Sequence, residues 1–247
     1  MKARVLFISL AALILFCCVP DLSAQDTSVS FTIAPPPAGY PVFEKGHTDY
    51  RIGANFVTID SDFMSITGAG IHGTYRRTYS SRLGTDASFG LSALVGDAFD
   101  TTMMQMSFTA NGQYLLVNSP SLQFILLAGV GGDVIYSTMS MEVMPGSSMD
   151  ITTTSSIYSL TGGIQANIPF SKFIFSPYGL AKTSSGTSSS ESDFGTYSAD
   201  IPTFNSITIG VDLLYKPWNV SLSSIYQKME EISMLSISVS KLIGKVF

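Results

Sequence analysis

The chain has 247 residues, and only 13% of them are Asp, Glu, Lys or Arg, against about 25% in ordinary soluble domains. The mean hydropathy is +0.32, yet no stretch beyond the N-terminus runs for ~18 apolar residues, which excludes a helical membrane protein. A formal net charge of −5 without basic clusters excludes a nucleic-acid-binding role. The apolar residues must therefore be distributed by alternation with polar ones.

Residues 1–24 have the pattern of an export signal peptide. Lys2 and Arg4 supply positive charge, residues 5–19 are apolar, and Leu22-Ser23-Ala24 fits a cleavage site. The apolar run is short for a membrane-spanning anchor. The sequence therefore predicts an exported protein.

The cysteines, Cys17 and Cys18, both lie within this signal, so the exported chain is expected to have neither a disulfide nor a thiolate site. The next segment, 25–46, contains the run 35–37 of three prolines and is interpreted as a flexible Pro-rich arm. The folded domain is expected to cover 47–247.

From residue 47 onward, apolar and polar residues alternate with a period of two. The alternating segments exceed the ~5–6 residues of soluble strands and suit a membrane crossing, which takes about 9–11 residues. If the two less regular segments, 172–184 and 232–246, pair outside the membrane, the number of strands falls to eight. The predicted strands are 48–60, 63–79, 84–97, 102–117, 121–137, 154–168, 172–184, 202–216, 219–228 and 232–246.

The connections between these segments alternate in length. Short periplasmic turns are expected at 80–83, 118–120, 169–171 and 217–218, and two long outward loops at 138–153 and 185–201. Because an apolar sheet in lipid cannot leave backbone N–H groups unpaired, it must close. The sequence thus predicts an all-β fold, a transmembrane antiparallel up-and-down β-barrel of about ten strands. A secreted β-sandwich is the alternative fold, and it predicts shorter strands and more charge.

Aromatic residues are expected to form two rings at the membrane interfaces. The periplasmic ring is predicted to contain Tyr50, Tyr75, Tyr79, Tyr114, Phe124, Phe173, Tyr215 and Phe247. The outer ring is predicted to contain Phe56, Phe63, Tyr136, Tyr158, Phe204 and Tyr226.

Together, the export signal, the Cys-free remainder, the amphipathic strands and the final Phe247 resemble the small bacterial outer-membrane β-barrel (porin-like) family. Residues 235–247 resemble its assembly signal, although Lys245 stands where an apolar residue is usual. The resemblance covers 47–247 and carries no functional residues. It implies a place in the outer membrane of a Gram-negative cell envelope. The implied partners are lipid, lipopolysaccharide and the barrel-assembly machinery.

The inward-facing positions are predicted to be mostly small, Gly, Ser, Thr and Asn, with a few charges among them. We interpret these charges as a structural polar network, because unpaired charge inside a barrel is costly. The more specific alternative is a narrow, water-filled pore, since small side chains leave room for water. The charged or titratable inward positions are Asp49, Arg51, His72, Arg76, Asp86, Asp133 and Asp212.

No catalytic, cofactor-binding or metal-binding residues are predicted, and the protein is interpreted as a non-enzyme. Ten-stranded outer-membrane proteases use an Asp pair with an Asp–His pair, and Asp60-Ser61-Asp62 supplies half of that pattern. His72 lies ten residues beyond Asp62, about 33 Å along a strand at ~3.3 Å per residue, too far for one site. His72-Gly73-Thr74 also lacks the Ser of the His-x-Ser pair of lipid A deacylases.

Every methionine after the signal is predicted to lie toward the outer end. We interpret them as a rim that packs against lipid or loops. The spacing Met139-x-Met141-x-x-Met144 leaves a Cu(I) site as the alternative. The methionines are Met64, Met103, Met104, Met106, Met139, Met141, Met144, Met149, Met229 and Met234.

Two functions follow from this reading. The first is a narrow pore for small solutes. The second is a non-transport structural or adhesive envelope protein that acts through its extracellular loops on an extracellular ligand. The small lumen lining favours the first function, and the long loops favour the second.

Overall fold

The computed structural model describes residues 43–61, 64–97, 100–144, 147–193 and 195–244. The predicted signal peptide 1–24 and most of the predicted arm lie outside the described residues, as do Asp62, Phe63, Lys245 and Phe247. No helix in the described part of the chain is long and apolar enough to cross a membrane. The elements are β1 (Thr48–Asp60), β2 (Ser65–Thr78), β3 (Leu83–Gly96), β4 (Thr102–Ser119), β5 (Leu122–Met144), β6 (Ser147–Phe170), β7 (Phe173–Ser192), β8 (Gly195–Tyr215), the 3-10 helix η1 (Lys216–Trp218), β9 (Val220–Met229) and β10 (Ile232–Gly244).

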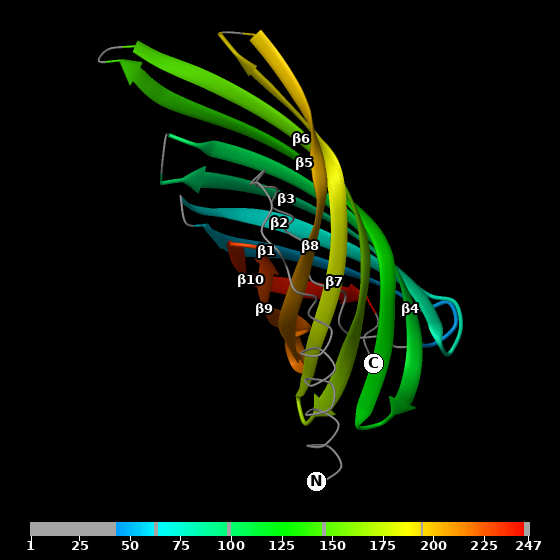
Figure 1. Cartoon of the computed structure of the whole chain (residues 1–247). Coiled ribbons are helices and arrows are strands. Elements are labelled where there is room, and N and C mark those ends of the chain that lie inside the picture. Colours follow the sequence, from blue (N-terminus) through cyan, green and yellow to red (C-terminus); the bar gives the residue numbers. More distant parts are fainter. Residues whose placement is uncertain (1–42, 62–63, 98–99, 145–146, 194, 245–247) are drawn as a thin grey trace.

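The ten strands form one closed antiparallel barrel (Figure 1). Each strand pairs with its neighbours in sequence, and β1 pairs with β10 to close the ring, with Asn55 opposite Ser238. The predicted ten strands are confirmed, and the alternative of eight strands is wrong. In a barrel of this size the interior is about wide enough to be filled by side chains.

The two ends of the barrel differ. The turn end carries the short connections 79–82, 120–121, 171–172 and 216–219 together with the described chain ends, Phe43 and Gly244. The projecting end carries the connections between β1 and β2, β3 and β4, β5 and β6, β7 and β8, and β9 and β10. Figure 1 shows the β5–β6 and β7–β8 pairs extending well past the other strands at this end.

The predicted long loops at 138–153 and 185–201 are wrong, because both stretches are β-hairpins. Strand β5 continues to Met144 and β6 begins at Ser147, while β7 continues to Ser192 and β8 begins at Gly195. Thr favours extended structure, and hydroxyl pairs such as Thr153 with Ser190 join neighbouring strands, so these polar stretches continue the strands beyond the apolar band.

We call this extension the projecting sheet. It contains the parts of β5–β8 beyond the ends of β4 and β9. At this end of the barrel β4 begins at Thr102, opposite Thr138, and the outermost β8–β9 pair is Ile207 with Lys228. The sheet comprises residues 139–144, 147–156, 185–192 and 195–206.

The outward face of the barrel is an apolar band that stops where the projecting sheet begins. On β6, Leu160 and Tyr158 are each 67% exposed, and the next positions on the same face are Ser156, Thr154 and Thr152. Exposed large apolar side chains around a closed barrel are stable in lipid rather than in water. The switch from Tyr158 to hydroxyl side chains therefore marks the edge of the membrane band.

At the turn end the predicted aromatic ring is present. The Tyr50 and Tyr75 ring centroids lie 5.2 Å apart, and the rings of Phe173 and Tyr215 lie 5.1 Å apart. Phe204, predicted for the outer ring, instead packs inside the barrel, because it shares its inward parity with Ser206.

The described end of the predicted flexible arm is folded against the barrel. Phe43 is 8% exposed, and the Gly46 N–H donates to the Thr78 carbonyl at 2.8 Å. The last residues of the predicted arm, 43–46, therefore pack against the barrel. Lys241, in the less regular segment 232–246, lies at the turn end, where its ammonium donates to the Trp218 carbonyl.

A charge on the apolar band should destabilise the barrel. Ile71 on β2 is 61% exposed within the band, and Ile71→Lys is expected to lower the free energy of unfolding by about 2–4 kcal/mol. Thr154→Lys, on an exposed position of the projecting sheet, should change it by less than ~0.5 kcal/mol. Urea unfolding in lipid vesicles measures both, and equal effects of the two substitutions would contradict a lipid-facing band.

Candidate functional site

The half of the interior nearer the turn end holds buried polar side chains beside buried apolar ones such as Leu115, Ile125, Leu214 and Leu242. All of the charged and titratable positions predicted to face inward are buried there or at mid-barrel: Asp49, Arg51, His72, Arg76, Asp86, Asp133 and Asp212. Their placement follows from strand alternation, because each shares its face with small inward residues such as Ser88 and Ser238.

Arg51 forms the largest of these polar networks. From β1 its guanidinium donates to Asp212 on β8 at 2.6 Å and to Ser240 on β10 at 2.5 Å, and it also bonds Ser221 and Ser223 on β9. Ser223 in turn donates to the second Asp212 oxygen at 2.9 Å. The first strand is thus tied to the last three strands across the line where the barrel closes.

Two further ion pairs accompany this network. The Arg76 guanidinium donates to the Asp49 carboxylate. The Asp133 carboxylate accepts from Gln105 at 3.1 Å and lies 3.7 Å from the Lys182 ammonium. Sequence reasoning did not find Lys182, because the alternation of its segment, 172–184, is irregular.

Asp86 has amide partners in place of a cation. Its carboxylate accepts hydrogen bonds from Asn111 at 2.8 Å and from Gln113 at 2.6 Å. The interior charges are therefore paired or hydrogen-bonded, as a structural network requires.

Several buried polar atoms in the described interior have no hydrogen-bond partner in the protein. They include His72 Nε2, Ser159 Oγ, Tyr178 Oη and Ser238 Oγ. Such groups are normally satisfied by ordered water. We use the name polar chamber for the part of the lumen that these atoms line, and their unmet hydrogen bonds suit it to ordered water.

The interior at the projecting end is apolar, which corrects the expectation of a mostly small and polar lining. Every strand except β7 contributes a buried or partly buried apolar side chain here. We call this set the apolar layer: Ile59, Ile66, Leu94, Met103, Ile135, Ile157, Ile201, Phe204, Met229 and Ile232.

The strand register brings neighbours in the apolar layer side by side, as with Leu94 opposite Met103 and Met229 opposite Ile232. The buried residues of the layer fall into two packed groups, one made of Ile135, Ile157 and Ile201 and the other of the remaining members. Met103 on β4 and Phe204 on β8 pack against both groups. Three strands separate β4 from β8 on one side of the ring and five on the other. Met103 and Phe204 therefore join the two groups into one apolar layer at the projecting end of the lumen.

The methionines lie toward the projecting end as predicted, but they divide between two environments. Met64, Met103, Met229 and Met234 pack inside the barrel, whereas Met104, 55% exposed, faces outward. The side chains of Met141 and Met144 lie outside the described part of the structure, so the Cu(I) alternative is untested.

The residues considered for catalysis are far apart. Asp60 lies at the projecting end and its carboxylate accepts a hydrogen bond from Ser65 at 2.8 Å. His72 is buried in the lumen opposite Gly53, seven residues along β1 from Asp60, or about 23 Å at ~3.3 Å per residue. Among the described residues no cluster of three His, Cys, Asp or Glu side chains could hold a metal.

Hydroxyl groups connect the strands of the projecting sheet. Thr153 and Ser190 are hydrogen-bonded at 2.9 Å, and Ser155 donates to Ser188 at 3.0 Å. Cross-strand hydroxyl pairs of this kind stabilise the outer part of the sheet, beyond the buried Ile201.

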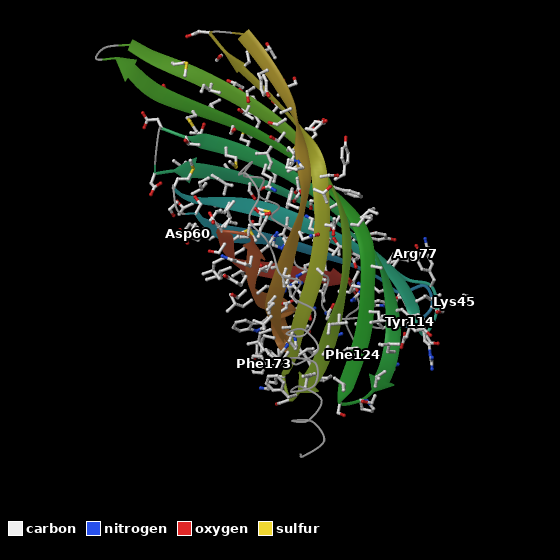
Figure 2. All side chains as sticks on the ribbon, in the orientation of Figure 1. Lys45, Asp60, Arg77, Tyr114, Phe124 and Phe173 are labelled. Atoms are coloured by element: carbon white, nitrogen blue, oxygen red, sulfur yellow. The ribbon has the colours of Figure 1, made fainter. Side chains whose placement is uncertain are left out.

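Charge is divided between the two ends of the barrel. Figure 2 shows Asp60 at the projecting end and Lys45 and Arg77 at the turn end. The acidic side chains described at the projecting end are Asp60, Asp97, Asp100, Asp150, Glu191, Asp193, Asp200, Glu230 and Glu231, with Lys228 as the one described exposed cation. The turn end carries Lys45, Arg77, Arg82, Lys172, Lys216 and Lys241, with Glu44 as its described exposed acid.

Comparison with known proteins identifies the fold. No family description and no curated protein matches the sequence. Among solved structures, the outer membrane protease OmpT from Escherichia coli is similar, with a TM-score of 0.59 at 12% identity over 83% of this chain and 98% of that one. The translocator domain of the autotransporter NalP from Neisseria meningitidis has a TM-score of 0.55 at 8% identity over 81% and 89% of the two chains. The chain therefore has the fold of outer-membrane β-barrel proteins.

Proposed function

We propose that this barrel is a non-conducting outer-membrane protein that holds the projecting sheet outside the cell as a contact surface for another molecule. The apolar layer carries this proposal. It lies between the polar chamber and the outer part of the projecting sheet, which carries hydroxyl side chains and the carboxylates of Asp150, Glu191 and Asp200.

The orientation rests on the two ends of the barrel. In outer-membrane barrels the short turns face the periplasm and the longer connections face outward. Here the turn end carries the short connections, and the projecting end carries the hairpins that extend beyond the membrane band. We therefore place the projecting end outside the cell.

A narrow pore is the second candidate function. The unpartnered polar atoms of the chamber, such as His72 Nε2, favour water in the lumen. A continuous path would still have to cross the apolar layer, and apolar constrictions of this kind exclude water and ions. The apolar layer therefore favours the contact surface over the pore.

Single-channel recording separates the two candidates. The full chain, refolded and inserted into a planar lipid bilayer, should give no conductance steps above those of the bilayer alone. Regular ohmic steps, even far smaller than those of a 16–18-stranded porin, would overturn the proposal in favour of the pore.

A further inference from the structure

We propose that the Gly195–Ile201 edge of β8 binds an extended, cationic segment of a partner protein as an added fifth strand of the projecting sheet. This inference rests on the proposed function, because it needs the projecting sheet to be free outside the cell. Beyond the proposed function, the inference names the strand edge that makes the contact and the charge of the partner.

The first observation is a strand edge without a neighbour. On one side β8 pairs with β7 from Ser192 opposite Gly195 to Gly186 opposite Ile201. On its other side, β9 begins to pair only at Ile207, and no other described strand lies there. Figure 1 shows this part of β8 rising above β9 and β10.

An unpaired edge presents backbone donors and acceptors to an incoming strand, and peptide recognition commonly uses such edges. Residues 195–200 are all exposed, and the edge through Ile201 is about 23 Å long at ~3.3 Å per residue. Pro202 follows directly and has no N–H to donate. The backbone hydrogen bonds to an added strand are therefore expected to stop at Pro202.

The second observation is the charge around this edge. Asp200 lies on it, Glu191 is the cross-strand neighbour of Thr196, and Asp193 lies in the turn above. The β9–β10 turn near the foot of the edge carries Glu230 and Glu231. No Lys or Arg occurs within residues 195–206.

This charge selects among possible occupants. A second copy of the chain would bring its own Asp200 and Glu191 against these carboxylates, and like charges across strands are destabilising. A strand with Lys or Arg at alternate positions is complementary, and complementary charge directs association and excludes other partners. The acidic edge is thus protected from self-association and open to a basic strand.

Peptide binding to the full chain in phosphatidylcholine nanodiscs tests the inference. The probe is a labelled seven-residue peptide that alternates Lys with Thr or Val, and fluorescence anisotropy measures its dissociation constant. Saturable binding that weakens with salt is expected, and the same peptide with Glu in place of Lys should not bind. Empty nanodiscs serve as the blank.

Backbone methylation separates strand addition from simple charge attraction. Two versions of the peptide carry N-methyl groups on alternate residues, in the two possible phases. Because an added strand uses one of its edges, one phase should abolish binding and the other should preserve it. Equal binding by both methylated peptides would overturn the inference.

Matched charge reversals locate the site. The double substitution Glu191→Lys and Asp200→Lys should weaken binding by about ten-fold or more, whereas Asp60→Lys, elsewhere on the same end, should weaken it less than about two-fold. Absence of saturable binding, equal loss in both variants, or an edge-to-edge dimer that excludes the peptide would each contradict the inference. If the barrel remains non-conducting in those cases, the proposed function stands without this partner.

Discussion

Arg51→Leu is expected to lower the free energy of unfolding by about 3–5 kcal/mol, because it leaves the Asp212 carboxylate buried without its cation. Arg51 is 2% exposed and Asp212 1% exposed, so water cannot readily replace the lost partner. Urea unfolding in lipid vesicles, followed by the fluorescence of Trp218 at the turn end, measures the change.

The double substitution Arg51→Leu and Asp212→Leu is the control. Replacing a buried ion pair with apolar side chains is often neutral or stabilising, so the double variant should be more stable than Arg51→Leu by at least ~2 kcal/mol. If the double variant is as unstable as the single one, the pairing of these two residues is not what stabilises the line of closure.

Polar substitutions in the apolar layer are expected to open the lumen. Leu94→Ser, Met103→Ser and Ile157→Ser together remove apolar volume from β3, β4 and β6 and leave hydroxyl groups that hold water. In a planar bilayer this variant should show conductance steps, smaller than those of a general porin because ten strands enclose a narrower lumen.

The matched control keeps the layer apolar, with Leu94→Met, Met103→Leu and Ile157→Leu, and it should stay silent. Each large-to-small change also costs about 2–5 kcal/mol, so the Leu94→Ser and Ile157→Ser single variants provide a milder test if the triple variant does not refold. Silence of every refolded Ser variant would show that the layer does not close the lumen.

Alternation of residues was sufficient to predict the barrel. Tyr158 and Leu160 face out while Ser159 faces in. Similar alternation in most segments led to about ten strands in sequence order, although the less regular segments 172–184 and 232–246 left eight strands as an alternative. The same parity also placed Arg51 and Asp212 in the lumen. The contact between Arg51 and Asp212 could not be predicted, because this contact depends on the register between β1 and β10, where the barrel closes.

The apolar layer was missed although its parity was visible. Leu94 shares its face with Ser88 and Ser92, and Ile135 shares its face with Asp133, so strict alternation places both inside. An interpretation that assigns every apolar residue to lipid overlooks them. The layer is recognisable only when inward apolar residues are seen to gather at one end of successive strands.

The projecting sheet was missed for a different reason. Residues 185–190 contain no apolar side chains, so they carry no period-two signal and were interpreted as loop. Their strand structure comes from backbone pairing and hydroxyl bonds such as Thr153 to Ser190. The free edge of β8 exists because β8 reaches further beyond the membrane band than β9, which ends at Met229. The sequence of either strand taken alone does not show this difference in length.

Cysteine labelling on intact cells tests most directly the claim that the projecting sheet is the outer surface of the protein. The native cysteines lie within the predicted signal peptide, so Thr154→Cys and Thr187→Cys in the sheet and Ser81→Cys in a short turn each provide a single reporter. A membrane-impermeant maleimide should label the two sheet positions on intact cells and Ser81→Cys only after the outer membrane is permeabilised. Labelling of Ser81→Cys on intact cells, with both sheet positions protected, would contradict the orientation and the contact surface built on it.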